Sequence, residues 1–156
     1  MQEYKVKVKD NGDKYWYQNN ELHRLDGPAV EWSTGDKEWH QNGKCHRLDG
    51  PAIERSNGNK SWWQNDKLHR LDGPAVELAS GSKFWWQNGK CHRLDGPAIE
   101  YVNGDKAWYI EGKKLTEEEF NNRNNKVEVT LEDIAKAKNI GGRCYIDVDK
   151  LRIKEH

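Results

Sequence analysis

Apolar residues in this chain come in short runs that alternate with polar residues, and the runs return every 23 residues. The first run has the form Lys-x-Trp, as in Lys14-Tyr15-Trp16, and is typical of a short strand rich in aromatic residues. The second run, Ala29-Val30-Glu31, has the same character. The pattern predicts strands that begin at Lys14, Lys37, Lys60, Lys83 and Lys106, and returning strands that begin at Ala29, Ala52, Ala75 and Ala98.

Turn residues separate these runs at fixed positions. A glycine precedes each Lys-x-Trp, and a pair such as Asn42-Gly43 or Asn88-Gly89 follows it. Because these residues accept positive φ, the pairs are strong hairpin signals. Asp-Gly-Pro then predicts a second turn or bulge, since proline donates no hydrogen bond to a sheet and glycine frees the backbone. The glycines and prolines argue against any helix between residues 4 and 112.

The second turn belongs to an identical heptapeptide, His-Arg-Leu-Asp-Gly-Pro-Ala, which begins at His23, His46, His69 and His92. Repeats of fixed period indicate an array in which each unit packs against its neighbours. We therefore predict a mainly β protein: an elongated, twisted antiparallel sheet of 23-residue β-hairpin repeats with a small α+β C-terminal cap. The pattern leaves open whether each repeat has two strands or three.

Three regions follow from this periodicity. Residues 1–10 alternate lysine and valine and predict an N-terminal capping strand, and residues 11–112 hold four full repeats and a partial fifth. Residues 113–156 form either a cap on the open sheet edge or a docking module. There, Thr116 and Glu119 predict a capping box that opens a short helix. Further elements are expected as strands at 127–129, 144–146 and 151–153 and a second helix from Thr130.

Composition limits the classes of function. Only 34% of the residues are hydrophobic, so a thick core is excluded, and eight tryptophans must supply much of the buried surface. The 26 basic and 26 acidic residues cancel, which argues against duplex nucleic acid as a partner. The N-terminus lacks the apolar run of a signal peptide or a membrane span, so we expect no membrane contact and a cytoplasmic location. The oligomeric state is left open.

The heptapeptide brings histidine, arginine and aspartate within four residues, a set of side chains that can serve catalysis or bind a metal. Four equivalent copies without a recurring nucleophile argue against an enzyme, and equivalent histidines of successive hairpins lie too far apart to share a metal ion. Neither a catalytic nor a metal site is predicted, and no cofactor. We expect instead that each arginine bonds an acid of a neighbouring repeat and that each histidine donates to a backbone carbonyl. Cys45 and Cys91 are expected to be small buried thiols, and Cys144 lies alone in the tail.

Aromatic and basic side chains are the candidates for binding. Strand alternation places Trp16 with Lys14 and Gln18 on one face of the strand, and Tyr17 on the other. One aromatic column is expected to be core and the other half exposed. The partner-binding candidates are Trp39, Trp62, Trp63, Trp85, Trp86, Arg47, Arg70, Arg93, His46, His69 and His92. Specificity is expected in the variable column Glu38, Ser61, Phe84 and Ala107.

The segment Trp62-Trp63-Gln64-Asn65-Asp66-Lys67-Leu68-His69-Arg70 resembles the MORN repeat, whose 23-residue hairpin contains an aromatic strand followed by Asn-Gly-Lys and His-Gly. The resemblance covers residues 11–112. More narrowly, the chain looks like the degenerate bacterial and phage variant, often described as antitoxin-like, whose loops read His-Arg-Leu-Asp-Gly-Pro-Ala. The resemblance implies a scaffold that binds other molecules, mostly proteins, without catalysis.

Two functional hypotheses follow. In the first, the repeat sheet is a non-enzymatic scaffold that binds a protein partner, as an inhibitor of a host defence factor or toxin in a bacterium or phage-infected cell. In the second, the aromatic rings and Arg47, Arg70 and Arg93 sequester a nucleotide or oligonucleotide. The first predicts a stoichiometric protein partner, and the second predicts salt-sensitive ligand binding that quenches tryptophan fluorescence.

Overall fold

The computed structural model describes residues 3–123, and the chain divides into two units, the first of which is Met1–Lys114. The described part is mainly β, with a long antiparallel sheet and one short helix, as the sequence predicts. The strands expected at 127–129, 144–146 and 151–153, the second helix and Cys144 lie outside the described residues.

Each of the middle repeats contributes four short strands, more than the two or three expected. In the second repeat these are β5 (Lys37–Glu38), β6 (His40–Gln41), β7 (Lys44–Cys45) and β8 (Ile53–Glu54). The first strand is broken at Trp39, whose N–H donates to Ala52 while its carbonyl accepts from His46. The equivalent strands are β9 (Lys60–Ser61), β10 (Trp63–Gln64), β11 (Lys67–Leu68) and β12 (Val76–Glu77), then β13 (Lys83–Phe84), β14 (Trp86–Gln87), β15 (Lys90–Cys91) and β16 (Ile99–Glu100).

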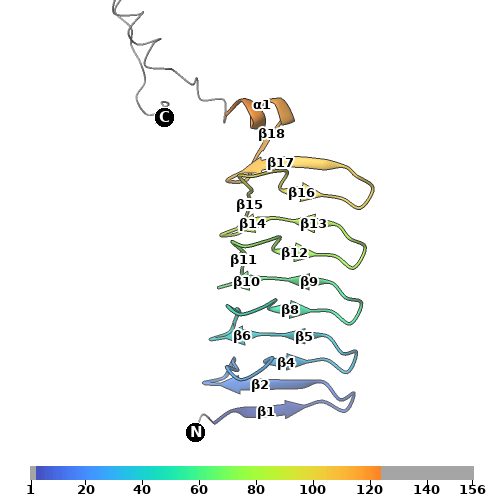
Figure 1. The fold of residues 1–156 in the computed structure, drawn as a ribbon. Coiled ribbons are helices and arrows are strands. Elements are labelled where there is room, and N and C mark those ends of the chain that lie inside the picture. The colour runs from blue at the N-terminus through green and yellow to red at the C-terminus, as the bar shows by residue number, and fades with distance from the viewer. Residues whose placement is uncertain (1–2, 124–156) are drawn as a thin grey trace, which may run out of the picture. The chain divides into compact units, whose positions relative to one another are not determined.

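In the second, third and fourth repeats the first and last strands join one 12-stranded sheet, and the two middle strands form a hairpin beside it (Figure 1). The sheet runs in the order β1-β2-β4-β5-β8-β9-β12-β13-β16-β17-β18, with β3 paired to β2. The separate hairpins are β6–β7, β10–β11 and β14–β15. The remaining strands are β1 (Lys5–Val8), β2 (Lys14–Gln18), β3 (Glu21–Leu22), β4 (Val30–Glu31), β17 (Lys106–Ile110) and β18 (Lys113–Leu115).

From β2 to β17, the register of the sheet pairs lysine with glutamate. Glu31 lies opposite both Lys14 and Lys37, and Lys37 also lies opposite Glu54. The same alternation continues through every later strand pair to Lys106. Opposite charges directly across a strand pair stabilise it by about 0.2–1 kcal/mol each, so the ladder favours this register over a one-residue slip.

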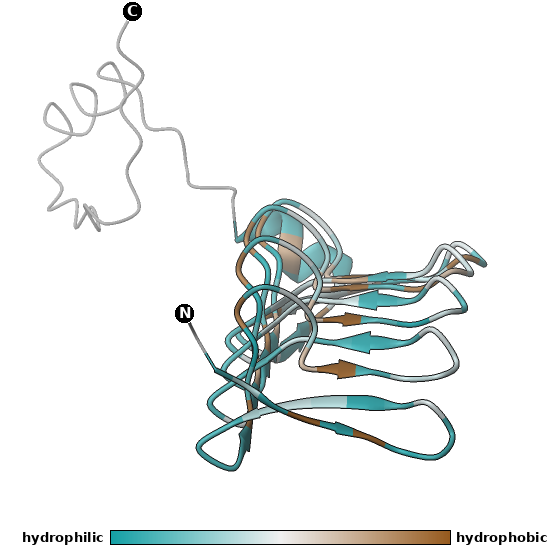
Figure 2. Ribbon diagram, turned by 90° about the horizontal axis from the view of Figure 1, so that it is seen from below, coloured by the Kyte–Doolittle hydropathy of each residue, from teal (hydrophilic) through white to brown (hydrophobic). Residues whose placement is uncertain are grey.

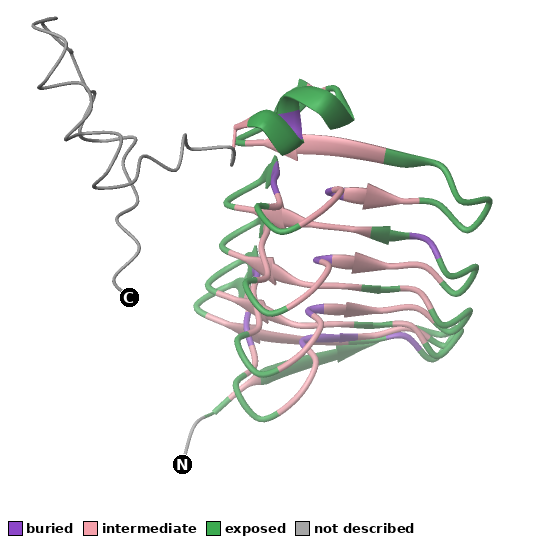
Figure 3. Ribbon diagram, turned by 45° about the horizontal axis from the view of Figure 1, so that its top comes forward, coloured by how far each residue is buried: buried purple, intermediate pink, exposed green. Residues whose placement is uncertain are grey.

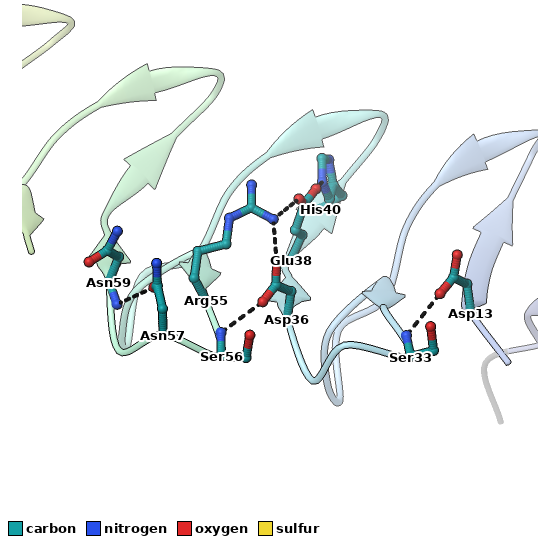
Figure 4. Close-up of polar contacts among 9 residues, drawn as sticks. All are labelled: Asp13, Ser33, Asp36, Glu38, His40, Arg55, Ser56, Asn57 and Asn59. Atoms are coloured by element: carbon teal, nitrogen blue, oxygen red, sulfur yellow. Dashed lines mark hydrogen bonds and ion pairs between the residues drawn. The ribbon is translucent and has the colours of Figure 1, made fainter. Parts of the chain in front are cut away.

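Backbone turns take the conformations that the sequence predicts. The hairpin-turn residues all have positive φ, including Glu111 (φ 49), and so do the glycines before each Lys-x-Trp. A side chain just after each of the first four glycine turns holds the next repeat: Asp13 accepts from the N–H of Ser33, and Asp36 accepts from that of Ser56 (Figure 4). Asn59 and Ser82 do the same for Ala79 and Val102.

Histidines of the heptapeptide form a second set of bonds between repeats, in a way that corrects the prediction. Within the described residues no hydrogen bond joins these rings to a backbone carbonyl, and Nδ1 of each ring instead accepts from a backbone N–H one repeat further on. His23 accepts from Asn42, and His92 accepts from Glu111, each at 3.1 Å. Nδ1 of His23 also lies 3.0 Å from the side-chain oxygen of Asn42, and Nδ1 of His92 lies 3.0 Å from a carboxylate oxygen of Glu111.

The buried interior is thin and consists of small side chains. Ala29, Ala52, Ala75 and Ala98 have no exposed surface, and Cys45 and Cys91 are buried free thiols, as predicted. Burial raises the pKa of the Cys45 thiol to about 12 and that of Cys91 to about 11. Figure 2 shows apolar residues confined to short segments, and Figure 3 shows the few buried segments beside the strands.

The helix α1 (Glu117–Asn122) lies in the second unit and begins with the predicted capping box. The Thr116 hydroxyl accepts from the N–H of Glu119 at 3.1 Å, and the Glu119 carboxylate accepts from the N–H of Thr116 at 2.8 Å. These two bonds satisfy backbone donors that would otherwise be unpaired at the first turn.

Burial of the histidine should set the cost of its removal. His92 is 8% exposed, so His92→Ala removes a buried acceptor from the N–H of Glu111 and should lower the free energy of unfolding by about 1–3 kcal/mol. His69 makes the same bond to Asn88 at the surface, and His69→Ala should cost only about 0.5–1.5 kcal/mol. Urea unfolding of both variants tests this order, and equal losses would contradict it.

Candidate protein-binding groove

An arginine lies across a tryptophan ring in every full repeat. The Arg47 Cζ is 4.1 Å from the centroid of the Trp39 ring, and the Arg70 Cζ is 4.0 Å from that of Trp62. The pairs Arg24–Trp16 and Arg93–Trp85 repeat the contact at 4.3 and 3.9 Å. A guanidinium over an indole face gains cation–π attraction. We call each such arginine with its tryptophan a clamp.

Hydrogen bonds hold the clamp within its own repeat, which corrects the expected pairing with a neighbouring repeat. Arg47 Nε donates to Asp49 at 2.9 Å, and Nη1 donates to the carbonyl of Pro51 and to Glu54 at 3.2 and 3.4 Å. Gly50 leaves room for the guanidinium, since a Cβ there would lie 2.9 Å from the Arg47 Cζ. The loop glycine therefore serves close packing, whereas the expectation was backbone freedom.

The outer edge of each heptapeptide exposes a leucine and an aspartate. Leu48 and Leu71 are each 74% exposed, and Leu25 and Leu94 are also exposed. The side chains of Asp49 and Asp72 are 84% exposed although one oxygen of each accepts from arginine. These pairs, which we call the loop ridge, are Leu25 and Asp26, Leu48 and Asp49, Leu71 and Asp72, and Leu94 and Asp95.

The arginines also keep the ridge negatively charged. The hydrogen bond from Arg47 lowers the pKa of Asp49, and the bond from Arg70 lowers that of Asp72. The pKa values of Asp26 and Asp95 are lowered by Arg24 and Arg93 in the same way. Each clamp sets one cation against two carboxylates, the ridge aspartate and a sheet glutamate, so these three groups carry a net charge of −1.

A groove lies between the loops of the second and third repeats. Its volume is about 560 Å³, and the side chains that line it come from two successive heptapeptides and the strand between them. They include Leu48, Asp49, Trp62, His69 and Leu71. Figure 3 shows that the exposed loops recur repeat after repeat beside the strands. A larger hollow of about 680 Å³ lies at the N-terminal edge and contains none of the predicted binding residues.

The structure brings only some of the predicted binding residues together. Arg47, Trp62, His69 and Arg70 line the groove. Trp39, Trp85, Arg93, His46 and His92 occupy the equivalent positions of other repeats. Trp63 and Trp86 lie instead on the hairpins, opposite Leu68 and Cys91.

Sequence reasoning missed the ridge leucines and aspartates. A signal was present, since the heptapeptide places a leucine in a hydrophilic turn, where strand alternation offers no buried face.

A charged cluster lies on the other face of the sheet, where Glu38 stands between Val30 and Ile53 of the neighbouring strands (Figure 4). Arg55 Nη1 lies 3.1 Å from Glu38 and 3.2 Å from Asp36, and the second Glu38 oxygen is 3.2 Å from Nε2 of His40. His40 pairs across its hairpin with Cys45, so the cluster has the composition of a cysteine–histidine–carboxylate site. The Cys45 thiol is buried with its pKa near 12, so it is not a thiolate nucleophile at neutral pH.

Within residues 3–123, no group of three or more histidine, cysteine or acidic side chains is arranged to hold a metal ion. In the same part of the chain no helix has the length and apolar character needed to cross a membrane. A scan of protein-family models finds no match to this chain, and a search of curated proteins finds no significant match. The resemblance to MORN repeats therefore stays a prediction.

The clamp geometry predicts that lysine cannot replace arginine. Arg70→Lys keeps the charge but removes the planar fork that bonds Asp72, Pro74 and Glu77 together. We expect a loss of about 1–2 kcal/mol in the free energy of unfolding, measured by urea denaturation. Lys67→Arg, on the exposed strand nearby, is the control and should change stability by less than about 0.5 kcal/mol. Equal values for the two variants would show that the fork does not stabilise the loop.

The Glu38 cluster predicts a loss of stability in acid. The hydrogen bond to His40 and the charge of Arg55 hold the pKa of Glu38 below its ordinary value of 4.5. A carboxyl with a lowered folded-state pKa stabilises the fold above its unfolded pKa, and this contribution disappears as pH falls through the folded value. In the fourth repeat, Phe84 and Tyr101 occupy the positions of Glu38 and Arg55 and form an edge-to-face ring pair. The double variant Glu38→Phe with Arg55→Tyr copies this pair and should remove the contribution of Glu38 to the pH dependence of stability.

Unfolding free energies measured from pH 7 to pH 3 test this expectation. As the pH falls below 4.5, the ordinary pKa of glutamate, the free energy of unfolding of the wild type should decrease more steeply than that of the double variant. Arg55→Tyr alone leaves Glu38 without its cation and should cost about 1–2 kcal/mol at pH 7, because half-exposed ion pairs contribute less than buried ones. Identical acid slopes for the wild type and the double variant would refute the role assigned to Glu38.

Proposed function

We propose that this protein is a non-enzymatic repeat scaffold that binds a protein partner through the loop ridge. The observation that carries the proposal is the exposure of the ridge leucines, which reaches 74% at Leu48 and Leu71. A leucine at the same exposed place in four successive loops forms a row of apolar side chains on a hydrophilic protein. Apolar surface that is exposed in this ordered way is typical of a protein interaction site.

The rigidity of the loop supports the same proposal. The arginine beneath each leucine–aspartate pair is fixed by its tryptophan, by the aspartate, and by the proline carbonyl of the loop. A surface that is already ordered loses little conformational entropy on binding, so more of the contact energy appears as affinity. The clamp residues therefore support the binding surface, and the leucines and aspartates form its outer layer.

The groove geometry weighs against the nucleotide hypothesis. Base stacking uses an aromatic face, and an arginine already covers one of the two ring faces of Trp39, Trp62 and Trp85. Phosphate binding requires available arginine donors, but the Arg47, Arg70 and Arg93 forks are already engaged with carboxylates. The exposed aspartates of the ridge would also repel a phosphate. Protein binding is therefore the better supported of the two functions.

The biological setting of the proposal comes from the resemblance. Repeats with His-Arg-Leu-Asp-Gly-Pro-Ala loops look like the antitoxin-like variant of bacteria and phages. We place the protein in the cytoplasm of a bacterium or a phage-infected cell, where its partner would be a host defence factor or a toxin. The hairpin repeats and the paired clamps are consistent with this scaffold role.

A capture experiment with matched variants tests the proposal. The tagged full-length chain is immobilised and exposed to bacterial lysate, and bound proteins are identified and then purified for titration. Leu48→Ser with Leu71→Ser should weaken binding of the purified partner by about tenfold or more, because apolar anchors at the centre of an interface contribute most of its energy. Since both leucines are exposed, the melting temperature of the variant should stay near that of the wild type.

The matched control is Val102→Ser, which removes an apolar side chain of similar exposure, 67%, from a turn away from the ridge. This variant should bind the partner as the wild type does. The proposal fails if no stoichiometric partner is captured, or if the double variant and the control bind it equally well.

A further inference from the structure

The loop ridge presents two kinds of group in strict alternation, one apolar and one anionic. In the second and third loops these are Leu48, Asp49, Leu71 and Asp72, and all four lie on the rim of the same groove. Both carboxylates are held in the charged form by the arginine bonds that lower their pKa values. A complementary partner therefore needs apolar surface and cations along one line.

The sheet sets the distance between equivalent groups. Each repeat adds two neighbouring strands, such as β5 and β8, to the 12-stranded sheet. Neighbouring strands are about 4.8 Å apart, so successive loops are spaced by about 9.6 Å and four loops span about 29 Å. A partner that uses all four loops has to repeat its contacts at this interval.

A polyproline II segment repeats at nearly this interval, because its side chains return to the same side after every three residues. It rises about 3.1 Å per residue with three residues per turn, so every third side chain points the same way at intervals of about 9.3 Å. Four such side chains span about 28 Å, within about 1 Å of the ridge.

The other regular conformations fit less well. In a β-strand, the side chain three residues further along points to the opposite side of the strand. In an α-helix, side chains on one face recur about every seven residues, which corresponds to a rise of about 10.5 Å. Four such contacts would span about 31.5 Å, which is longer than the span of the four loops.

We propose that the occupant of the ridge is a polyproline II segment of the partner with lysine or arginine at every third position. The cations would lie at the exposed oxygens of the ridge aspartates, and the prolines between them would pack against the ridge leucines. Proline-rich segments lose little entropy on binding because they are extended before they bind. This inference rests on the proposed protein-binding function and specifies the chemistry of its partner.

Synthetic peptides test the inference with the full-length chain. The probe is (Lys-Pro-Pro)₄, and its controls are a peptide of the same composition with the four lysines in one block and the charge-reversed (Glu-Pro-Pro)₄. By fluorescence anisotropy, (Lys-Pro-Pro)₄ should bind about tenfold more tightly than the block peptide, the glutamate peptide should not bind, and added salt should weaken the complex.

Protein variants complete the design. Asp49→Asn with Asp72→Asn keeps an oxygen for the arginine bond but removes the two charges, and should weaken (Lys-Pro-Pro)₄ binding by about tenfold. Asp10→Asn with Asp105→Asn changes the net charge equally away from the ridge and should leave binding unchanged. The inference is overturned if the lysine peptides bind equally, if none binds, or if both aspartate variants behave alike.

The two proposals fail in different ways. If a captured protein needs the ridge leucines but no peptide binds, the binding function stands and the polyproline II occupant is wrong. If capture does not depend on Leu48 and Leu71, the proposed function itself is wrong.

Discussion

The arginine laid across a tryptophan is the interaction on which each repeat depends. The chain has too few aliphatic residues for a thick core, and its fully buried side chains are mainly alanines. The guanidinium replaces that missing core, because it covers an indole face and at the same time joins a loop aspartate, a loop carbonyl and a sheet glutamate. Apolar contact, charge and loop conformation are thus fixed by a single side chain.

Local sequence patterns predict the parts of the fold that are locally determined. The 23-residue period, the positive-φ turns and the capping box at Thr116 all follow from residue types in sequence, and the structure confirms them. The number of strands does not follow, because it depends on pairing between strands: Trp16 and Trp39 make the same two backbone bonds, but β2 also pairs with β1 and stays continuous, whereas the strand of the second repeat is divided at Trp39. Strand alternation holds across that junction, because Trp62 and Gln64 both line the groove while Trp63 and Trp86 lie opposite Leu68 and Cys91 on the hairpins.

The candidate site was predicted in part for a similar reason. Residue type selected Arg47, Trp62, His69 and Arg70 as binding candidates, and the structure places these four residues at one groove, while their role in binding stays a prediction. It could not reveal that arginine turns back on its own repeat, nor that histidine accepts from an amide of the next repeat, because both depend on the path of the loop in space. Because the arginine and histidine side chains form hydrogen bonds within the fold, the surface left for a partner is the exposed leucine and aspartate of each loop.

Repetition then connects the stability of the fold to its binding capacity. A single exposed leucine beside a single carboxylate would attract any partner only weakly, since such contacts are shared with most protein surfaces. Four copies are held at one interval by the paired strands of the sheet. Once a partner with the same period has bound one loop, its contact with each further loop is intramolecular and takes place at a high effective concentration. Affinity and specificity would both then come from the spacing, which the backbone hydrogen bonds of the sheet determine.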